Sequence, residues 1–231
     1  MMAAVAIDHV ADAAARPVGL GALRAAVLRT LAGDRPFTIV SNNCWGAHVY
    51  QALDTPYATP FVGLFIPPRS YLTLLGDFAR LMRSGLEFTA TSRSPSVNAW
   101  REREGLRYPI GLLGGEVEID FQHYPDEAAA REAWRRRSAR MVPDPSRLFF
   151  KFDDREGATT ADIEAFDALD LPNKVCFTAR ACAAPAIVVP PTPGEDHAPD
   201  GVSLAAISHR CFNTLRWIST LPRWAPLPSL I

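Results

Sequence analysis

The chain has 231 residues, of which 48% are hydrophobic and 21% charged, and its formal net charge is −1. A length of this order fits one large domain or two small ones, and the apolar content supports a full core rather than disorder. A charge near zero supplies no basic excess for binding nucleic acid, so we expect no nucleic-acid partner.

We expect residues 1–17 to form a flexible N-terminal lead. We expect no secretory signal, because the N-terminus lacks a basic start followed by a continuous apolar core. No stretch reaches the run of about 18 apolar residues that a membrane span requires, so we expect no membrane span. We therefore expect a cytoplasmic protein.

The cysteines and histidines give no sign of a metal centre. Four cysteines lie at wide, irregular spacing with no CxxC pair, and the five histidines are scattered. This pattern argues against a structural zinc site and against a disulfide framework. We expect no cofactor and no metal.

The first elements are a helix, a strand and a second helix. Leu20, Leu23, Val27 and Leu31 recur at helical spacing, which predicts a helix over 18–31 that Gly33 ends. An apolar strand follows over 37–40. It stops in a polar cluster, after which a helix begins around residues 44–46.

Proline punctuation and hydrophobic periodicity predict the rest of the chain. A proline-rich loop with an extended piece at 62–66 leads to a helix over 67–82, in which apolar residues form a buried stripe. The further expected elements are a strand at 86–91, a polar connector at 92–108, a helix at 127–140, a strand at 148–152, a helix from 160 to 169, strands at 174–178 and 186–189, and a last helix at 202–218.

Residues 109–123 predict a β-hairpin that turns at Gly114–Gly115. In its second arm Val117 and Ile119 alternate with Glu118 and Asp120. This alternation predicts one buried face and one wet face.

Strands that alternate with helices over this length favour an α/β fold, with a mainly parallel sheet, helices on both faces and one antiparallel hairpin. We expect a single α/β domain over residues 18–220, and a surface tail over 221–231. The sequence contains no internal repeat.

Polar residues gather where four of the expected strands end. In open α/β sheets, ligands bind outside the carboxyl ends of strands, so these clusters are expected to converge. The clusters are Ser41-Asn42-Asn43-Cys44, Ser92-Arg93-Ser94, His123-Tyr124 and Asp153-Asp154-Arg155.

One interpretation of these clusters is nucleophilic catalysis. Cys44 would be the nucleophile, because a cysteine at a helix start feels the positive end of the dipole, which lowers its pKa. His123 would be the base, with Asp153 or Asp154 orienting it.

Two further groups complete this interpretation. Asn42 or Asn43 would donate to an oxyanion, and His48, one turn after Cys44, could reach the thiol. The alternative is that Cys44 is a small buried hydrophobe without a chemical role.

A second interpretation is binding of a phosphate or nucleotide sugar. The turn at 41–46 would present backbone N–H groups to an anion, with Arg93, Arg155 and Lys151 as counter-charges. Asp153 and Asp154 would hold a divalent cation. The chain lacks the glycine-rich fingerprints of phosphate-binding loops.

A third interpretation is a non-enzymatic glycan-binding or assembly factor. Its contact surface would be the aromatic and proline-rich segment 57–71. This class predicts an exposed apolar groove without convergent ionisable groups.

Several ordered motifs resemble a known bacterial family, the domain of unknown function 1919, over about residues 37–218. Members of that family are commonly labelled exopolysaccharide or capsule biosynthesis proteins, which implies a setting in cell-surface glycan assembly but no established catalytic residues. The motifs are Ser41-Asn-Asn-Cys-Trp-Gly, Thr59-Pro-Phe-Val-Gly-Leu-Phe-Ile, Tyr108-Pro-Ile-Gly-Leu-Leu-Gly, Phe121-Gln-His-Tyr, Phe150-Lys-Phe-Asp-Asp-Arg, Asn173-Lys-Val-Cys-Phe-Thr-Ala and Ile207-Ser-His.

These observations together predict a transferase in bacterial surface-polysaccharide biosynthesis that acts on a glycan or sugar-derived substrate. Cys44 and His123 are the expected catalytic pair. The substrate contacts are expected from Ser41, Asn42, Asn43, His48, Ser92, Arg93 and Arg155. A glycosyltransferase-like enzyme that uses a nucleotide sugar is the alternative. The oligomeric state is not predicted.

Overall fold

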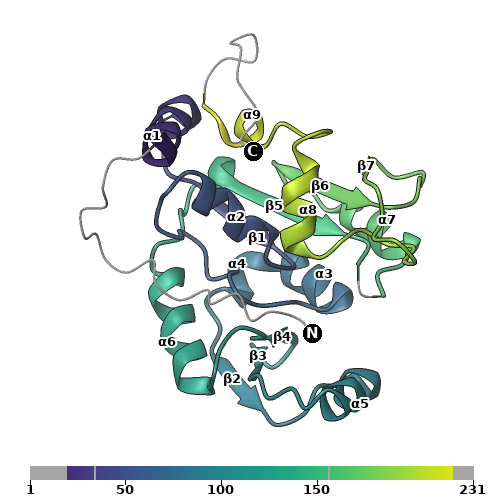
Figure 1. Ribbon diagram of the computed structural model, residues 1–231. Coiled ribbons are helices and arrows are strands. Elements are labelled where there is room, and N and C mark those ends of the chain that lie inside the picture. The colour runs from purple at the N-terminus through teal and green to yellow at the C-terminus, as the bar shows by residue number, and fades with distance from the viewer. Residues whose placement is uncertain (1–19, 34, 156, 221–231) are drawn as a thin grey trace.

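Four parallel strands form the main sheet of the computed structural model, which describes residues 20–33, 35–155 and 157–220 (Figure 1). The strands lie in the order β1-β5-β6-β7 and pair in parallel throughout. Their bounds are β1 Thr38–Ser41, β5 Leu148–Asp153, β6 Lys174–Thr178 and β7 Ile187–Val188. The expected lead at 1–17 and tail at 221–231 lie outside the described residues.

Alternate residues of these strands point to opposite faces of the sheet, because side chains in a strand alternate with a period of two. Ile39 and Phe149 belong to one hydrophobic cluster, whereas their neighbours Val40 and Phe150 belong to another. The strands are therefore buried on both faces, as expected of a parallel sheet.

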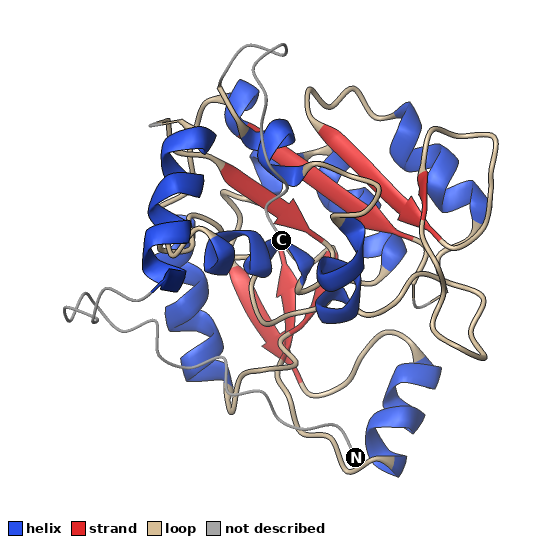
Figure 2. Ribbon diagram, turned by 45° about the horizontal axis from the view of Figure 1, so that its top comes forward, coloured by secondary structure: helices blue, strands red, loops and turns tan. Residues whose placement is uncertain are grey.

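Helices cover both faces of the sheet, as Figure 2 shows. One cluster is closed by α1 (Leu20–Ala32), α2 (Trp45–Ala52), α8 (Gly201–Ser208) and α9 (Thr214–Ile218). The other contains side chains of α3 (Pro68–Gly76), α6 (Glu127–Ser138) and α7 (Thr160–Ala168). The predicted α/β class, with a parallel sheet between helices, is confirmed. Among the described helices, none has the length and apolar character needed to cross a bilayer.

The predicted hairpin is confirmed, and it belongs to a second, antiparallel sheet with the order β2-β3-β4. Its strands are β2 (Leu86–Thr89), β3 (Ile110–Leu113) and β4 (Val117–Asp120). Gly114 and Gly115 form the turn with positive φ angles of 61° and 72°, which glycine adopts without strain.

The prediction that one face of β4 is exposed to solvent is wrong. The Glu118 and Asp120 side chains are buried, at 3% and 2% relative exposure. Glu118 accepts hydrogen bonds from the Ser92 hydroxyl and from the Arg93 backbone N–H. These bonds satisfy a buried carboxylate, so alternation of polar residues did not mark a solvent face here.

Three helical predictions needed correction. The helix expected over 67–82 is interrupted at Asp77, whose φ of −140° is not helical, so it forms α3 and α4 (Phe78–Leu81). The expected connector at 92–108 contains α5 (Pro95–Arg103), which Ser94 caps. The last helix is divided into α8 and α9 by residues 209–213, and a short 3-10 helix (Pro145–Arg147) precedes β5.

The segment 57–66 links the two sheets. The Ile66 N–H donates to the Asn42 carbonyl at the end of β1 (2.8 Å), and Phe65 and Asp120 exchange two backbone hydrogen bonds of 2.8 Å. The segment therefore runs beside the carboxyl end of β1. Tyr57 and Tyr71, at either end of the aromatic segment 57–71, are 7% and 0% exposed, so the contact surface of the third interpretation is wrong.

Candidate functional site

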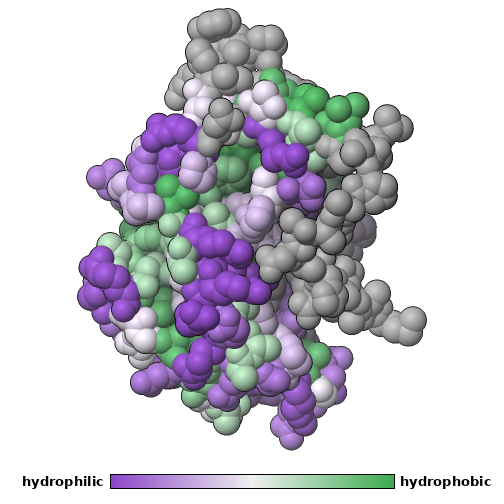
Figure 3. Space-filling view, turned by 90° about the vertical axis from the view of Figure 1, so that its left-hand side faces the viewer, coloured by the Kyte–Doolittle hydropathy of each residue, from purple (hydrophilic) through white to green (hydrophobic). Residues whose placement is uncertain are grey.

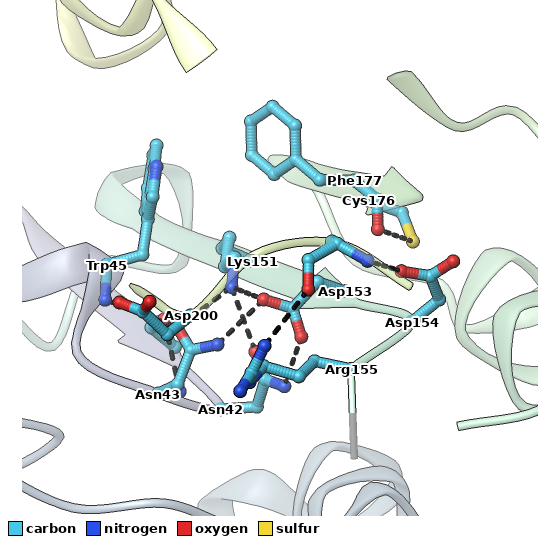
Figure 4. Close-up of polar contacts among 12 residues, drawn as sticks. Asn42, Asn43, Trp45, Lys151, Asp153, Asp154, Arg155, Cys176, Phe177 and Asp200 are labelled. Carbon is cyan, nitrogen blue, oxygen red and sulfur yellow. Dashed lines mark hydrogen bonds and ion pairs between the residues drawn. The ribbon is translucent and has the colours of Figure 1, made fainter. Parts of the chain in front are cut away.

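The carboxyl ends of β1 and β5 carry a polar cluster without solvent exposure. The Lys151 ammonium donates to the Asp153 carboxylate, to Asn42 Oδ1 (3.2 Å) and to Asn43 Oδ1 (2.9 Å). Asn42 Nδ2 and Asn43 Nδ2 donate to the two Asp153 oxygens at 3.0 and 2.7 Å. In Figure 4 the Asp153 carboxylate lies between Lys151 and the two amides.

The opposite charges of Lys151 and Asp153 compensate one another within this cluster. Burial alone would raise the pKa of Asp153, but the Lys151 charge and the Asn42 hydrogen bond outweigh it and hold the pKa below its usual value. Burial lowers the pKa of Lys151. Because both side chains are 0% exposed, no substrate reaches Asp153 in this arrangement, and its contacts are those of a structural ion pair.

Cys44 occupies the N-cap of α2, but its thiol is not activated. The α2 Trp45 N–H is capped by Asn43 Oδ1 at 3.2 Å. Burial raises the pKa of Cys44 to about 11, against smaller opposite effects of the Gly63 backbone and the Lys151 charge. The expectation that the helix dipole lowers this pKa is therefore wrong, because loss of water outweighs the dipole.

Partial burial lowers the pKa of His48 and of His123, the two expected partners of Cys44, although His48 is only half-buried and His123 is an exposed residue. Within the described residues, neither the His123 nor the His48 ring makes a hydrogen bond to the thiol. The structure nevertheless brings Cys44 and His123 to one place. The His123 N–H donates to the Gly63 carbonyl (3.1 Å), and Gly63 is also the backbone neighbour of the Cys44 thiol.

Asp154 faces away from Asp153, as expected of successive residues in a strand, and Figure 4 shows the two carboxylates apart. One Asp154 oxygen accepts from the Thr178 hydroxyl (2.7 Å) and the Ala179 N–H (3.0 Å), and the other from the Ala198 N–H (2.6 Å). Asp153 and Asp154 therefore do not form the expected cation-binding pair. No group of three possible metal ligands occurs within residues 20–33, 35–155 and 157–220.

The backbone N–H groups of the turn at 41–46 are also inaccessible to an anion. Ser41 and Asn42 are fully buried, and a Cβ added to Gly201 would lie 2.6 Å from the Trp45 backbone nitrogen. The N-terminus of α8 therefore packs directly against that of α2. Asp200 caps α8 by accepting from the Val202 and Ser203 N–H groups (2.9 and 3.0 Å).

Ser92 and Arg93, which were expected to contact the substrate, do not lie at the carboxyl edge of the parallel sheet. Both residues hold Glu118 in the antiparallel sheet, and Arg93 Nη1 also donates to the Glu116 carbonyl at 2.9 Å. The strand-end rule failed here because Ser92 and Arg93 follow β2, which does not belong to the parallel sheet.

A pocket of about 380 Å³ opens at the carboxyl ends of β5 and β6. Asp154 follows β5, Arg180 follows β6, Thr159 and Thr160 begin α7, and His197 lies in the loop before α8. Arg180 pairs with Asp196 at 3.3 Å, and this side-chain pair is 51% and 79% exposed. The pocket thus combines cationic, anionic and hydroxyl groups at the expected edge of the sheet.

Arg155 and the loop at 195–200 connect this pocket with α2. Arg155 Nη1 lies 3.4 Å from both Glu195 Oε2 and the Ala198 carbonyl. Burial acts to raise the pKa of Asp200, but hydrogen bonds from Ser203 and Val202, with a smaller effect of the Arg155 charge, hold that pKa below its usual value. Of the predicted residues, Arg155 and Asp154 therefore contribute to this edge.

The sequence reasoning missed Arg180 and assigned no role to His197. Arg180 stands two residues beyond the end of β6, so the same strand-end rule that selected Asp153 could have found it. His197 had no such signal, because it lies in a proline-rich loop that is held in place by contacts distant in sequence, among them the Ala198 N–H, which donates to Asp154, and the Arg155 contact with Glu195.

The sequence pattern of a protein family described as a domain of unknown function, DUF1919, matches residues 25–197. The chain belongs to this family. The match covers β1 to β7 but ends before α8. The predicted family is confirmed, although the resemblance had been extended to about residue 218.

A similar protein comes from Haemophilus influenzae (strain ATCC 51907 / DSM 11121 / KW20 / Rd), where it is described as an uncharacterized protein. The two are 37% identical over 145 residues, which is 63% of each chain. The aligned part therefore spans less than two thirds of that relative's length.

Proposed function

We propose that this DUF1919 protein binds a sugar in the pocket at the carboxyl ends of β5 and β6, and acts there as a cytoplasmic transferase of bacterial surface-polysaccharide biosynthesis. The observation that carries the proposal is the lining of that pocket. Arg180, Asp196, His197, Thr159 and Thr160 are among the residues that line this pocket of about 380 Å³.

This lining suits a polyhydroxylated ligand. Carboxylates accept hydrogen bonds from sugar hydroxyls, guanidinium groups donate to them, and threonine hydroxyls do both. Arg180 is balanced by Asp196 and Asp154, so the described lining has no cationic excess of the kind that favours a bare phosphate. The volume lies near the lower end of the roughly 300–1,000 Å³ of small-molecule sites.

The setting in surface-glycan assembly rests on the labels that family members commonly carry. The place of the pocket supports a ligand site independently, because open α/β sheets bind ligands at this edge. Since Asp153 and Asp154 are occupied by protein contacts, the proposal uses no metal held by that pair.

The test is calorimetric titration with a panel of neutral monosaccharides, disaccharides and nucleotide sugars. Arg180→Ala should weaken binding of the preferred sugar about tenfold, the effect of one charge-assisted hydrogen bond. Arg103→Ala is the matched control, because Arg103 is also exposed and paired, with Glu104 at 2.9 Å.

Transfer is tested separately, by mass spectrometry of products after incubation with a nucleotide sugar and the bound saccharide. A new glycosidic product would support the transferase. Sugar binding without any transfer would favour the non-enzymatic alternative, and the absence of binding to every saccharide at millimolar concentration would refute the pocket.

A second candidate is acyl transfer by Cys44 with His123 as base. It is favoured by one observation, namely that both residues lie against Gly63. It is opposed by the raised pKa of the thiol. Alkylation of Cys44 as a function of pH tests whether its thiol can act as the nucleophile.

A further inference from the structure

A second and larger pocket lies at the opposite edge of the parallel sheet. It has a volume of about 590 Å³ and opens between the end of α1 and the loop at 53–58. Phe37, which precedes β1, lies in its lining, whereas Cys44 follows the same strand. This amino-edge pocket is therefore separate from the proposed sugar site.

The inner wall of the amino-edge pocket is apolar. Phe37, Tyr50 and Leu53 are 9%, 2% and 1% exposed and belong to the hydrophobic core behind it. Ala26 of α1 and Pro56 of the loop also line the pocket. The three core side chains leave little surface accessible, so an apolar chain placed here would mainly cover the half-buried Ala26 and the exposed Pro56, which is favourable by the hydrophobic effect.

Two guanidinium groups belong to the same lining. Arg29 Nη1 donates to the Leu53 carbonyl at 2.7 Å and to the Asp54 carbonyl at 3.3 Å, and it lies 3.9 Å from the Asp54 carboxylate in an exposed ion pair. Arg35 Nη2 pairs with Asp144 at 2.8 Å. Each arginine uses one nitrogen in these contacts, so further N–H donors remain for a ligand. No described residue of the lining is acidic, in contrast to the sugar pocket.

The pair between Arg35 and Asp144 does not compete strongly with a ligand. Its side chains are 63% and 37% exposed, and exposed pairs contribute little free energy. A guanidinium group binds phosphate or carboxylate through two parallel hydrogen bonds, which is stronger and more specific.

We propose that the amino-edge pocket binds an amphiphilic anion, meaning an apolar chain that ends in a phosphate or carboxylate. The chain lies against Phe37, Tyr50 and Leu53, and the head group is held by Arg29 and Arg35. This assignment does not depend on the proposed sugar site.

The surface beside the pocket extends its apolar character. Leu23 and Val27 of α1 are 58% and 50% exposed. At 3.6 residues a turn they lie next to Ala26 and Thr30, which line the pocket. Figure 3 looks onto the side of the molecule where α1 lies, and shows apolar surface in a hollow between hydrophilic side chains. A chain longer than the pocket would continue over this surface.

The experiment is calorimetric titration of the full chain with decyl phosphate, decanoate and neutral decyl glucoside, each below its micelle-forming concentration. The two anions should bind, and the neutral glucoside should bind at least tenfold more weakly. A preference between the two anions identifies the head group as phosphate or carboxylate.

Variants locate the site. Ala26→Trp should fill the pocket and weaken binding of the preferred anion more than tenfold, and Arg29→Gln and Arg35→Gln should each weaken it about tenfold. Arg103→Gln is the matched control and should leave the affinity unchanged, because Arg103 is as exposed as Arg35 but far along the chain in α5.

Three results would overturn the proposal. These are no binding of either anion, equal binding of decyl glucoside, and loss of affinity that is the same in Arg103→Gln as in Arg35→Gln. Because Arg35 is exposed, its variant should keep the wild-type melting temperature, so the test stands even where Ala26→Trp fails to fold.

Discussion

Cys44 illustrates how burial can reverse a local electrostatic expectation. The dipole of a short helix favours the thiolate by about a kilocalorie per mole or less, whereas removing a charge from water costs several times as much. The pKa of Cys44 is raised because the loss of hydration outweighs the effect of the dipole. A nucleophile at this position would need a substrate or a conformational change that restores the thiolate.

We predict that Cys44 resists alkylation by iodoacetamide below pH 9, since the pKa of its thiol is about 11. The rate for each cysteine would be followed by peptide mass spectrometry as a function of pH. The exposed Cys211 of the same chain serves as the internal control for reagent activity.

A midpoint for Cys44 below the ordinary value of about 8.5 that rises in His123→Ala would contradict this prediction and support acyl transfer. A midpoint far above that value, unchanged by His123→Ala, would remove the thiolate from the mechanism.

The Lys151–Asp153 pair gives a second prediction at this scale. Asp153→Asn should lower the free energy of unfolding by about 3–5 kcal/mol, because it leaves a buried lysine charge without a counter-charge. Urea unfolding followed by circular dichroism measures the change.

The matched control is Glu104→Gln, which breaks the exposed pair with Arg103 and should change stability by less than about 1 kcal/mol. Equal effects of the two substitutions would mean that the buried cluster contributes no more than a surface pair. In the double variant Lys151→Met/Asp153→Leu much of the loss should be recovered, since no unpaired charge remains.

The helices α2 and α8 pack closely through their N-termini at the carboxyl edge of the sheet. Gly201→Ala should destabilise the protein by about 1–3 kcal/mol, as overpacking usually does. A Cβ there would meet two backbone nitrogens, of Trp45 at 2.6 Å and of Cys44 at 3.0 Å, which cannot rotate away. The melting temperature is the measurement.

Gly76→Ala, at the end of α3, is the matched control, because a Cβ at that position meets nothing within 4 Å. It should leave stability unchanged or raise it slightly, since alanine favours the helix. A Gly201→Ala protein as stable as the wild type would show that α2 and α8 can move apart.

The elements that the sequence predicted well are those whose signal is local. The helix α1 follows from its apolar spacing and from Gly33, and the hairpin follows from Gly114–Gly115. The strands β1 and β5 were found because burial on both faces makes most of their residues apolar, although β5 also carries Lys151 and Asp153.

The errors arose where contacts between residues distant in sequence determine whether a side chain is buried. Glu118 and Asp120 alternate with apolar residues as a solvent face would, yet Glu118 is buried because the distant Ser92 satisfies it. The candidate site shows the same division. The strand-end rule brought Asn42, Asn43 and Asp153 together correctly, but whether they face a ligand or Lys151 depends on burial.

At the scale of the whole molecule, the two edges of the parallel sheet differ in chemistry. The carboxyl edge presents mixed polar groups with balanced charge, whereas the amino edge presents an apolar wall with two arginines. Both pockets are bounded by loops, and both are supported by strands that are buried on each face. A rigid sheet of this kind can hold two ligands of different character without contact between them.

The histidines on the carboxyl side predict how the stability of the whole molecule depends on pH. Burial lowers the folded-state pKa of both His48 and His123 below the usual value of about 6.5. The unfolded chain therefore binds more protons than the folded one between those lowered values and pH 6.5. Linkage then requires the free energy of unfolding to fall as the pH falls through this window, and to be fully retained above it.

Urea unfolding at a series of pH values from 7.5 to 5 would measure this slope, and the double variant His48→Gln/His123→Gln should flatten it. Asp153 and Asp200 do not contribute in this range, because carboxyl groups with lowered pKa values lose their stabilising effect only below about pH 4. A wild-type protein whose stability is constant from pH 7 to 5 would contradict this prediction, because it would mean that neither imidazole loses hydration on folding.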